Sequence, residues 1–490
     1  IVLLFLPILL LFLLQTYKTK NIRSPPGPKG LPSISNLHQF DSSNPDNVWK
    51  LSQKYGPLMS LRIGSMSTLI VSSTKMAKEV WKTHDLAFCS RPALLAMRKL
   101  SYKGSDLAFA PYNESWREKR NLCVMHLFNP NRVQQFRPTR EDEVSRMIQK
   151  ISKSVAASKP VSLSELLMSM TSSIICRLAF GKRYEGDERE GNGFCAMLHE
   201  TEAMLGSFFF SDYFPFMGWV DKLTGMKRRL ENNFKELDIF FQEIIQDHSD
   251  SKVPKNGKED IIDIFLQIRK DGGLKVDITW DHIKAVLMNV FAGGSDSSAT
   301  TIVWFMTYLM KNSRVMKKVQ EEIRSEIGKR GFVDEDDVQK STYLKAVVKE
   351  SIRLQPAAPF LISRETTEKC IIEGYEIQPK TLVFVNSWAI GRDPEAWENP
   401  DEFYPERFND SSIDFKGQHL EFKTFGGGRR ICPGLHMGIA TVELALANLL
   451  YKFDWKMPPG MNKEDLDLEC LPGVTMNKKI ALCLTPINYE

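Results

Sequence analysis

The chain has 490 residues, 42% apolar and 26% charged, so it can bury a large core and is not a disordered protein. Its net charge of +5 is small for this length and argues against nucleic acid as the main partner. The eight cysteines include no CxxC pair, which favours a reducing compartment with most thiols packed as small hydrophobes. Cys432 is the exception, because its neighbours are not those of an ordinary core thiol.

The N-terminus begins with an apolar stretch, and we interpret residues 1–15 as an uncleaved membrane anchor. A full span needs about 20 apolar residues and the chain starts at Ile1, so we expect this anchor to be truncated. The alternative is a buried core helix. Residues 16–34 are basic and proline-rich, which predicts a stiff hinge before a single larger body at 35–490.

The remaining periodicity predicts a mainly α fold with a smaller β region (α+β). Strand-like patterns occur at 58–63 and 68–71, around a Gly64-Ser65 turn, and again at 371–377 and 381–387. Helical patterns include 140–155, 226–248, 281–310, 313–328 and 435–452. The polar run 247–260 is expected to be a surface loop. No repeat or linker divides this body.

The exceptional cysteine lies in the run Phe-Gly-Gly-Gly-Arg-Arg-Ile-Cys-Pro-Gly at 425–434. Three glycines let the backbone turn tightly and lie against a flat ligand. Cys432 comes just before the predicted helix 435–452, with Pro433 suited to the first helical turn. The partial positive charge and free N–H groups of a helix N-terminus lower a thiol pKa and hold a thiolate. Zinc is disfavoured because no second ligand has suitable spacing; His436 is expected on the helix surface.

This run resembles the haem-binding loop of the cytochrome P450 family. The family pattern F-x-x-G-x-R-x-C-x-G is matched by Phe425, Gly428, Arg430, Cys432 and Gly434. The resemblance extends from the hinge to the C-terminus and implies the cytochrome P450 fold, with haem b (iron protoporphyrin IX) between a long central helix and this loop. It implies that Cys432 binds the iron as a thiolate and that 35–490 is the haem-thiolate catalytic domain.

Two other groups of residues fit the same resemblance. Glu350 and Arg353 share a helix face, and with Arg407 they are similar to the family's structural Glu-Arg-Arg network. Haem carboxylates need cationic partners, and arginine binds a carboxylate in a bidentate way. The resemblance implies that the propionate partners are Trp116, Arg120, Arg364 and Arg430.

The glycines and hydroxyls at 293–298 are unfavourable inside the predicted helix 281–310, which predicts a local distortion. This run resembles the family's oxygen-activation motif, in which an acid and an alcohol deliver protons. The resemblance implies Asp296 as the acid and Ser297 as the alcohol. The family usually has threonine where this chain has Ser297, which lacks the methyl group that restricts the rotamer. Gln355 and Thr424 are smaller departures from the common His and Pro.

The hinge, the 415–419 stretch and the residues of the Cys432 loop resemble those of plant A-type microsomal members. That resemblance implies attachment to the endoplasmic reticulum membrane, in contact with membrane lipid, with the catalytic domain in the cytosol. The chain has no dinucleotide-binding motif or P-loop, so electrons are expected from a separate NADPH–cytochrome P450 reductase. The candidate docking residues, each equally well interpreted as solvated surface, are Lys119, Arg132, Lys423 and Arg429.

The function implied is that of a monooxygenase, which inserts one atom of O2 into a small apolar or aromatic substrate of plant specialised metabolism. The segments expected to line the substrate site are 94–110, 208–216, 289–293, 357–362 and 471–475. The Phe208–Phe210 cluster equally fits packed core or membrane contact. Two other functions stay open. One is a haem-thiolate isomerase or dehydratase, which the Asp296–Ser297 pair disfavours; the other is a non-catalytic haem-binding membrane protein.

Overall fold

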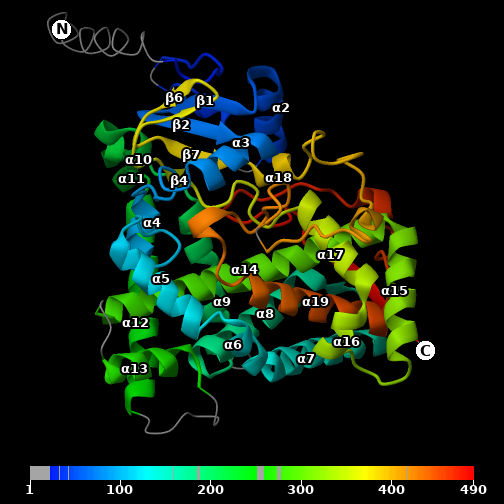
Figure 1. Cartoon of the computed structure of the whole chain (residues 1–490). Coiled ribbons are helices and arrows are strands. Elements are labelled where there is room, and N and C mark those ends of the chain that lie inside the picture. The colour runs from blue at the N-terminus through cyan, green and yellow to red at the C-terminus, as the bar shows by residue number, and fades with distance from the viewer. Residues whose placement is uncertain are drawn as a thin grey trace, which may run out of the picture.

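The computed structural model describes residues 23–489 except 33, 42–43, 158, 185–187, 251–258, 273–276 and 417. The predicted anchor and the first part of the hinge lie outside the described residues. A four-stranded sheet occupies one end of the molecule, and a larger body of helices fills the rest (Figure 1). The predicted mainly α fold with a smaller β region is confirmed.

Most of the described chain is helical. The α-helices are α2 (Pro45–Tyr55), α3 (Thr74–Lys78), α4 (Leu95–Leu100), α5 (Glu114–His126), α6 (Pro130–Gln135), α7 (Arg137–Ala156), α8 (Leu163–Phe180), α9 (Glu188–Gly206), α10 (Phe210–Tyr213), α11 (Gly218–Leu223), α12 (Met226–Asp250), α13 (Ile261–Asp271), α14 (Trp280–Lys311), α15 (Ser313–Ile327), α16 (Glu335–Lys340), α17 (Thr342–Leu354), α18 (Ser387–Ile390) and α19 (Leu435–Lys452). Short helices of other types are η1 (Leu37–Gln39), η2 (Glu79–Thr83), η3 (Pro215–Met217), η4 (Pro405–Phe408), η5 (Gly428–Arg430) and η6 (Lys463–Asp465). The five predicted helices correspond to α7, α12, α14, α15 and α19.

The strands form three small sheets of order β1-β2-β7-β4, β3-β9-β8 and β5-β6. Their bounds are β1 (Leu58–Ile63), β2 (Met66–Val71), β3 (Val161–Ser162), β4 (Arg364–Glu365), β5 (Cys370–Ile372), β6 (Tyr375–Ile377), β7 (Leu382–Val385), β8 (Phe453–Lys456) and β9 (Cys483–Asn488). The predicted hairpin is β1–β2, with Gly64 at a positive φ of 58° in its turn. The strand predicted at 371–377 is wrong, because a turn at Glu373-Gly374 divides it into β5 and β6.

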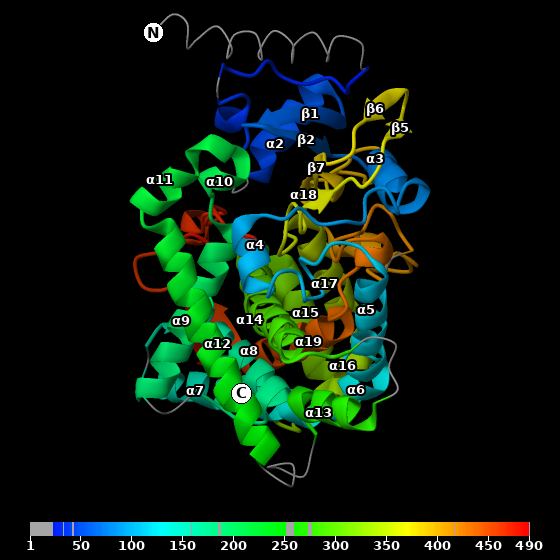
Figure 2. The same ribbon diagram turned by 90° about the vertical axis from the view of Figure 1, so that its left-hand side faces the viewer.

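Helix α14 crosses the body and connects its two largest hydrophobic cores (Figures 1 and 2). Residues of its first half, from Ile283 to Phe291, belong to a core shared with α8, α9, α12 and α13, and residues of its second half, from Ala299 to Leu309, belong to a core shared with α7, α8 and α19. The glycine- and serine-containing run at 293–298 lies at the junction between these cores. A Cβ on Gly294 would come 2.5 Å from Ile175 Cδ1, so glycine allows α8 and α14 to approach closely there.

Helix α8 is the one helix among the described residues long and apolar enough to cross a membrane. However, 67% of its apolar window is buried inside the protein, where it packs along α14. Its hydrophobicity is therefore accounted for by core packing.

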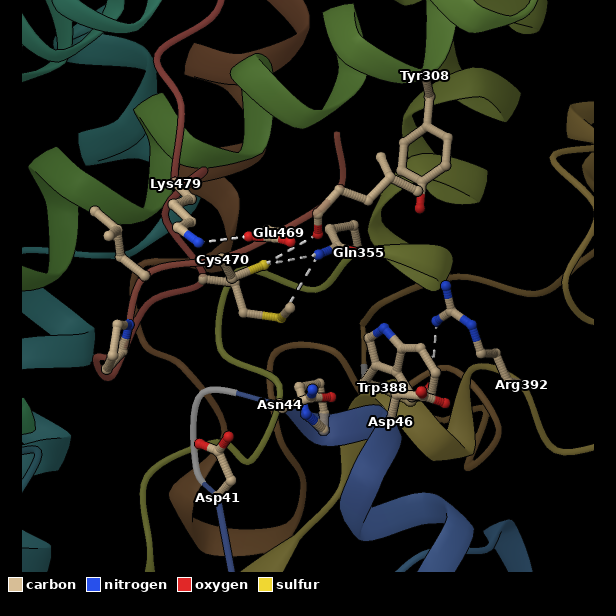
Figure 3. Close-up of a pocket in the computed structure, with 15 residues that line it drawn as sticks. Asp41, Asn44, Asp46, Tyr308, Gln355, Trp388, Arg392, Glu469, Cys470 and Lys479 are labelled. Carbon is tan, nitrogen blue, oxygen red and sulfur yellow. Dashed lines mark hydrogen bonds and ion pairs between the residues drawn. The ribbon is translucent and has the colours of Figure 1, made fainter. Parts of the chain in front are cut away.

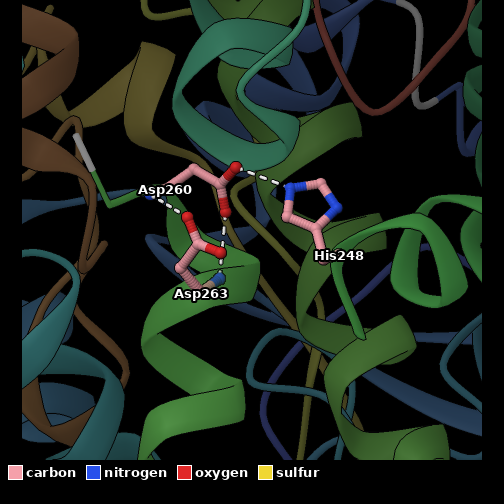
Figure 4. Close-up of side chains that lie close together, drawn as sticks. All are labelled: His248, Asp260 and Asp263. Carbon is pink, nitrogen blue, oxygen red and sulfur yellow. Dashed lines mark hydrogen bonds and ion pairs between the residues drawn. The ribbon is translucent and has the colours of Figure 1, made fainter. Parts of the chain in front are cut away.

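The expected surface loop at 247–260 begins later than predicted, because α12 continues to Asp250, and both of its ends are structured. Residues 251–258 lie outside the described part of the chain. His248 is buried, with Nδ1 2.7 Å from the Ile244 carbonyl and Nε2 2.8 Å from Asp260 Oδ2 (Figure 4). Asp260 also caps α13 through the Asp263 N–H at 3.0 Å. This contact joins the end of α12 to the start of α13.

The His248–Asp260 contact predicts a pH-dependent contribution to stability. Burial lowers the pKa of His248, but the hydrogen bond and charge of Asp260 outweigh it, and the net pKa lies above the ordinary value. The stabilisation is therefore fully present below the unfolded-state pKa and is lost as pH rises through the raised pKa. We expect His248→Ala to destabilise the protein by about 1–3 kcal/mol at pH 5.5 and by less at pH 8.5. Urea unfolding at both pH values checks this, with exposed His38→Ala as control; an equal loss at both would contradict it.

Candidate functional site

The Cys432 loop closes on itself before α19 begins. The Cys432 N–H donates to the Phe425 carbonyl at 3.0 Å, which places these two residues next to each other at the base of the loop. Gly426 and Gly428 have positive φ values of 76° and 63°. Residues with a side chain rarely adopt this conformation, so the two glycines permit the tight turn.

Gly427 and Gly428 make room for protein atoms. A Cβ on Gly427 would lie 2.9 Å from Trp81 Cδ2, and a Cβ on Gly428 would lie 2.1 Å from Asp85 Oδ1. The absence of a side chain at these two positions is therefore required by contacts within the protein, and the expectation that the glycine backbone lies against a flat ligand stays a prediction. Their missing side chains let η2 and Asp85 approach the loop, where Arg429 pairs with Asp85 at 3.2 Å.

Cys432 lies two residues before Gly434, which is the N-cap of α19. Pro433 thus precedes the helix, and the prediction that it occupies the first helical turn is wrong. The Gly434 N–H donates to the sulfur. Cys432 keeps a solvent-accessible surface, yet enough protein surrounds the sulfur for burial to raise the thiol pKa, against the opposing effects of the Gly434 N–H and Arg120. The helix terminus therefore acts in the predicted direction through the Gly434 N–H, but the larger effect of burial gives a net rise in the thiol pKa. Binding to a metal cation would deprotonate the thiol.

The four residues predicted to bind the haem propionates lie in one cluster. The Arg430 guanidinium lies 3.8 Å from the centre of the Trp116 ring, and the Arg120 guanidinium lies 5.6 Å from the same ring. Arg364 donates to the Gly427 carbonyl at 2.7 Å, and Arg120 donates to the Ile431 carbonyl. The structure thus brings together side chains from α5, β4 and η5 beside the Cys432 loop.

Arg91 belongs to the same cluster, although no sequence motif marked it. It is buried and donates to the Ala108 carbonyl at 2.8 Å and the Ser363 carbonyl at 2.8 Å. Burial lowers its pKa well below the ordinary value, and the nearby Arg430 and Arg364 charges lower it further. Arg91 lies between elements, where periodicity carries no information, so its burial could not be recognised from the sequence.

The cluster has more positive than negative charge. Burial lowers the pKa of Arg364 to about 10 and that of Arg430 to about 9, and the neighbouring guanidiniums add to the effect on Arg430. Asp85 and Asp106 supply opposing negative charge. A bound dianion would relieve the remaining repulsion and form charge-assisted hydrogen bonds. The two carboxylates of haem b meet this requirement, so the residues present fit the cofactor.

Glu350, Arg353 and Arg407 form a buried network. Arg353 makes a bidentate pair with Glu350 at 2.7 and 2.8 Å, and Arg407 Nε donates to the same carboxylate at 3.1 Å. Arg353 also donates to the Pro400 and Glu402 carbonyls at 2.6 and 3.0 Å. These contacts connect α17 to the 400–408 segment that includes η4.

Asp296 and Ser297 lie on α14 and point to different partners. The Ser297 hydroxyl donates to the Gly293 carbonyl at 2.6 Å, and Ser297 is half-buried. Asp296 is buried and accepts two hydrogen bonds from Asn477 Nδ2 at 3.0 and 3.1 Å. The predicted distortion of this run is wrong, since α14 is a continuous α-helix; local hydroxyl-to-carbonyl bonding and packing against α8 offset its poor helix propensity.

The contacts of three residues with Asp296 were not predicted from the sequence. Asn477 and Thr475 bond to Asp296 from the loop before β9, and Glu202 lies on α9. Burial raises the pKa of Asp296, and burial followed by the nearby Asp296 charge raises the pKa of Glu202 to about 9. Glu202 Oε1 has no hydrogen-bond partner among the described residues. Both carboxyls are thus biased towards carrying a proton, and only the tertiary structure places them together.

The five segments predicted to line the substrate site meet in one hydrophobic core. Its members include Leu107, Phe209, Phe291, Ile362 and Val474, one from each segment. Within the phenylalanine cluster, Phe209 is buried and Phe208 is exposed. The packed-core interpretation therefore fits Phe209, and the membrane-contact interpretation fits Phe208. This apolar core includes the first half of α14, and residues of α9 belong to it as well.

The predicted docking residues do not form one exposed set. Lys423 is only 4% exposed, so its proposed surface role is wrong. Lys119 and Arg132 are half-buried, and Arg132 lies 3.4 Å from Glu259. Arg429 is exposed beside the Cys432 loop, although it pairs with Asp85.

A separate pocket of about 490 Å³ lies between α2, α18 and the 468–479 loop (Figure 3). Its lining includes Gln355, whose amide contacts Cys470 Sγ at 3.6 Å. Neither Cys432 nor any residue of the arginine cluster lines it. Gln355, which stands where the family commonly has histidine, therefore lines this separate pocket.

Comparison with known proteins agrees with this geometry. Residues 25–484 match the family model described as Cytochrome P450. The chain is 51% identical to 5-OH-xanthotoxin synthase of Pastinaca sativa and 50% identical to 6,7,8-trihydroxycoumarin synthase of the same plant, each over 99% of this chain and 97% of the relative. A zebrafish cytochrome P450 structure with progesterone aligns with a TM-score of 0.77 at 25% identity, covering 90% of this chain and 98% of that one.

The chain therefore belongs to the cytochrome P450 family, and the predicted relationship to plant A-type members is confirmed. It is a haem-containing oxidoreductase of the monooxygenase class, and O2 and an organic substrate are its reactants. This finding favours the monooxygenase over the two alternatives that the sequence left open.

Proposed function

We propose that this chain hydroxylates a planar aromatic substrate of the coumarin class, with Cys432 as the iron ligand. The observation that carries the proposal is the position of Cys432, at the mouth of α19 and next to a buried cluster of arginines with excess positive charge. The substrate class is supported by the two coumarin-oxidising relatives at 50–51% identity and by the apolar core that joins all five lining segments.

In the proposed arrangement the chain holds the cofactor from two sides. Cys432 Sγ binds the iron, while Trp116, Arg120, Arg364 and Arg430, with Arg91, hold the carboxylates. Phe425 and Gly434 shape the loop around the sulfur. The bound haem supplies an iron centre at which dioxygen is activated. Glu350, Arg353 and Arg407 act at a distance, by bracing α17 against the 400–408 segment.

Asp296 and Ser297 are proposed to move protons. Asn477 holds the Asp296 carboxyl in place, and burial favours its protonated form, so Asp296 can release a proton to water or to the neighbouring hydroxyl. The Ser297 hydroxyl is held by Gly293 on the same helix. A rotation about χ1 releases it from this carbonyl, and serine makes that rotation more easily than threonine.

The proposed setting is the cytosolic face of the endoplasmic reticulum membrane, with NADPH–cytochrome P450 reductase as electron donor. A group of exposed apolar side chains supports contact with membrane lipid: Phe216 is 95% exposed, and Trp219 and Leu223 on α11 are exposed as well. The Ser65 N–H donates to the Tyr213 carbonyl at 2.8 Å, which places α10 beside the β1–β2 turn and so on the flank nearest the hinge (Figure 2). Phe216, Trp219 and Leu223 would then hold the chain at the membrane together with residues 1–15.

Expression of the full chain in microsomes with plant reductase tests this function. We expect the protein in the membrane fraction, a thiolate-type band in the reduced carbon-monoxide difference spectrum, and NADPH-dependent hydroxylation of at least one coumarin. A thiolate band with no turnover across a panel of coumarins would reject the substrate class. A histidine-type band would reject the proposed ligand.

Replacement of Asp296 by asparagine tests the proton-transfer role. The amide can keep a hydrogen bond to Asn477 but cannot release a proton, so we expect kcat to fall about 100-fold with the thiolate band unchanged. Product formed per NADPH should fall as well. Asp281→Asn, at an exposed position of the same helix, is the matched control and should retain activity. A kcat within twofold of the parent protein would contradict the role.

A further inference from the structure

The loop at 106–110 faces the arginine cluster with its carbonyl groups. Four N–H groups on the side chains of Arg91, Arg430 and Trp116 donate hydrogen bonds to these carbonyls. The contacts are Arg91 Nε to Ala108 O at 2.8 Å, Arg430 Nη1 to Leu107 O at 3.3 Å, Arg430 Nη2 to Ala110 O at 2.7 Å and Trp116 Nε1 to Leu107 O at 3.0 Å. The path of this loop therefore sets where the side chains that are proposed to hold the haem carboxylates lie.

The same loop turns its N–H groups towards a different pair of side chains, Asp106 and Asn289. Asn289 Oδ1 on α14 accepts from the Leu107 and Ala108 N–H groups, both at 3.0 Å. Asn289 Nδ2 donates to Asp106 Oδ2 at 2.9 Å, and the Phe109 N–H donates to Asp106 Oδ1 at 3.1 Å. Asp106 is 1% exposed. One asparagine thus makes three hydrogen bonds that tie the loop to α14.

Asn289 is the one member of this hydrogen-bonded group that lies on helix α14 and not in the loop 106–110. It lies one helical turn before Gly293, within one of the segments predicted to line the substrate site, and the loop belongs to another. A buried N–H or carboxylate that loses its partner is costly, so loop and helix are expected to move together. Asp106 also opposes the charge of Arg430. The loop is therefore held between the substrate side and the arginine cluster.

We propose that Asn289 is a positioning residue that couples the substrate-lining loop 106–110 to haem retention. Through its bonds to Asp106, Leu107 and Ala108 it fixes the carbonyls that orient Arg91 and Arg430. A substrate that displaces the loop changes the hold on the haem carboxylates, and loss of the Asn289 contacts loosens both. This inference rests on the proposed roles of the arginine cluster.

The test compares haem-loaded parent protein with Asn289→Ala and with two further variants. In Asn289→Ala we expect amide hydrogen exchange at Leu107 and Ala108, and transfer of haem to excess apomyoglobin, each to become about tenfold faster. Asp106→Asn disturbs the pair from its other side and should act in the same direction. The double exchange Asn289→Asp with Asp106→Asn restores a donor–acceptor pair and should bring both rates back to within about threefold of the parent.

Asn312→Ala is the matched control, because Asn312 ends the same helix and its amide donates to the Tyr308 carbonyl. Both rates should stay at the parent values in this variant. Faster loop exchange with unchanged haem transfer in Asn289→Ala would overturn the coupling. No change in either rate would overturn the positioning role of Asn289. If Asn289→Ala does not fold, the Asp106→Asn variant and the double exchange decide the question. Failure of the parent protein to show a thiolate-type band would instead reject the proposed function.

Discussion

Replacement of Cys432 by serine is expected to abolish the thiolate-type band in the reduced carbon-monoxide difference spectrum. A serine hydroxyl is a poor ligand for haem iron, and the thiolate is the group that gives this class of haem protein its electronic character. The Gly434 N–H that donates to the sulfur would still be present, so the loop is expected to keep its shape. Monooxygenase turnover should be lost completely, and the difference spectrum of the purified protein measures the change.

The other described cysteines provide the control for this result. Cys483 is exposed on β9, and Cys470 lines the separate pocket near Gln355. Cys483→Ser and Cys470→Ser should each keep the thiolate-type band and turnover. A thiolate-type band that survives in Cys432→Ser would show that another residue holds the iron.

Replacement of Glu350 by glutamine is expected to be strongly destabilising. Glutamine preserves the shape of the side chain but removes the charge that balances Arg353 and Arg407, and Arg353 and Glu350 are both fully buried. Removing one partner of a buried pair typically costs about 3–5 kcal/mol, because the remaining charge is left without compensation. The free energy of unfolding in urea, and the yield of haem-loaded protein, measure the effect.

An ion pair with an exposed arginine offers a matched comparison. Arg314 pairs with Glu406 at 2.6 Å, but 62% of the Arg314 side chain is exposed. Arg314→Gln should therefore cost at most about 1 kcal/mol, since Glu406 keeps hydrogen bonds from Lys318 and Tyr343, both at 3.0 Å. If Glu350→Gln and Arg314→Gln lose similar free energies, burial of the Glu350 network is not the source of its stability.

Local pattern was sufficient for several features of this protein. Alternation and a Gly-Ser turn predicted β1–β2, and helical spacing predicted α14 and α19, because these signals depend on residues close together in the chain. The Cys432 loop was recognisable for the same reason, since all its determinants lie within ten residues. Some of the predictions that failed depend on residues elsewhere in the chain: Lys423 is buried, and the end of α12 is held by Asp260. Others failed for local reasons, since a turn at Glu373-Gly374 divides the strand predicted at 371–377.

The sequence by itself determined the class of protein and predicted the iron ligand and the acid–alcohol pair that we propose, because each is carried by a short run of residues with distinctive chemistry. The tertiary structure alone decided which groups surround them. It buried Lys423, added Arg91 to the arginine cluster and connected Asn289 to Asp106. It also brought Glu202 and Asn477 to Asp296. Burial, charge compensation and hydrogen bonding are properties of neighbours in space, and here those neighbours are up to 183 residues apart in the chain.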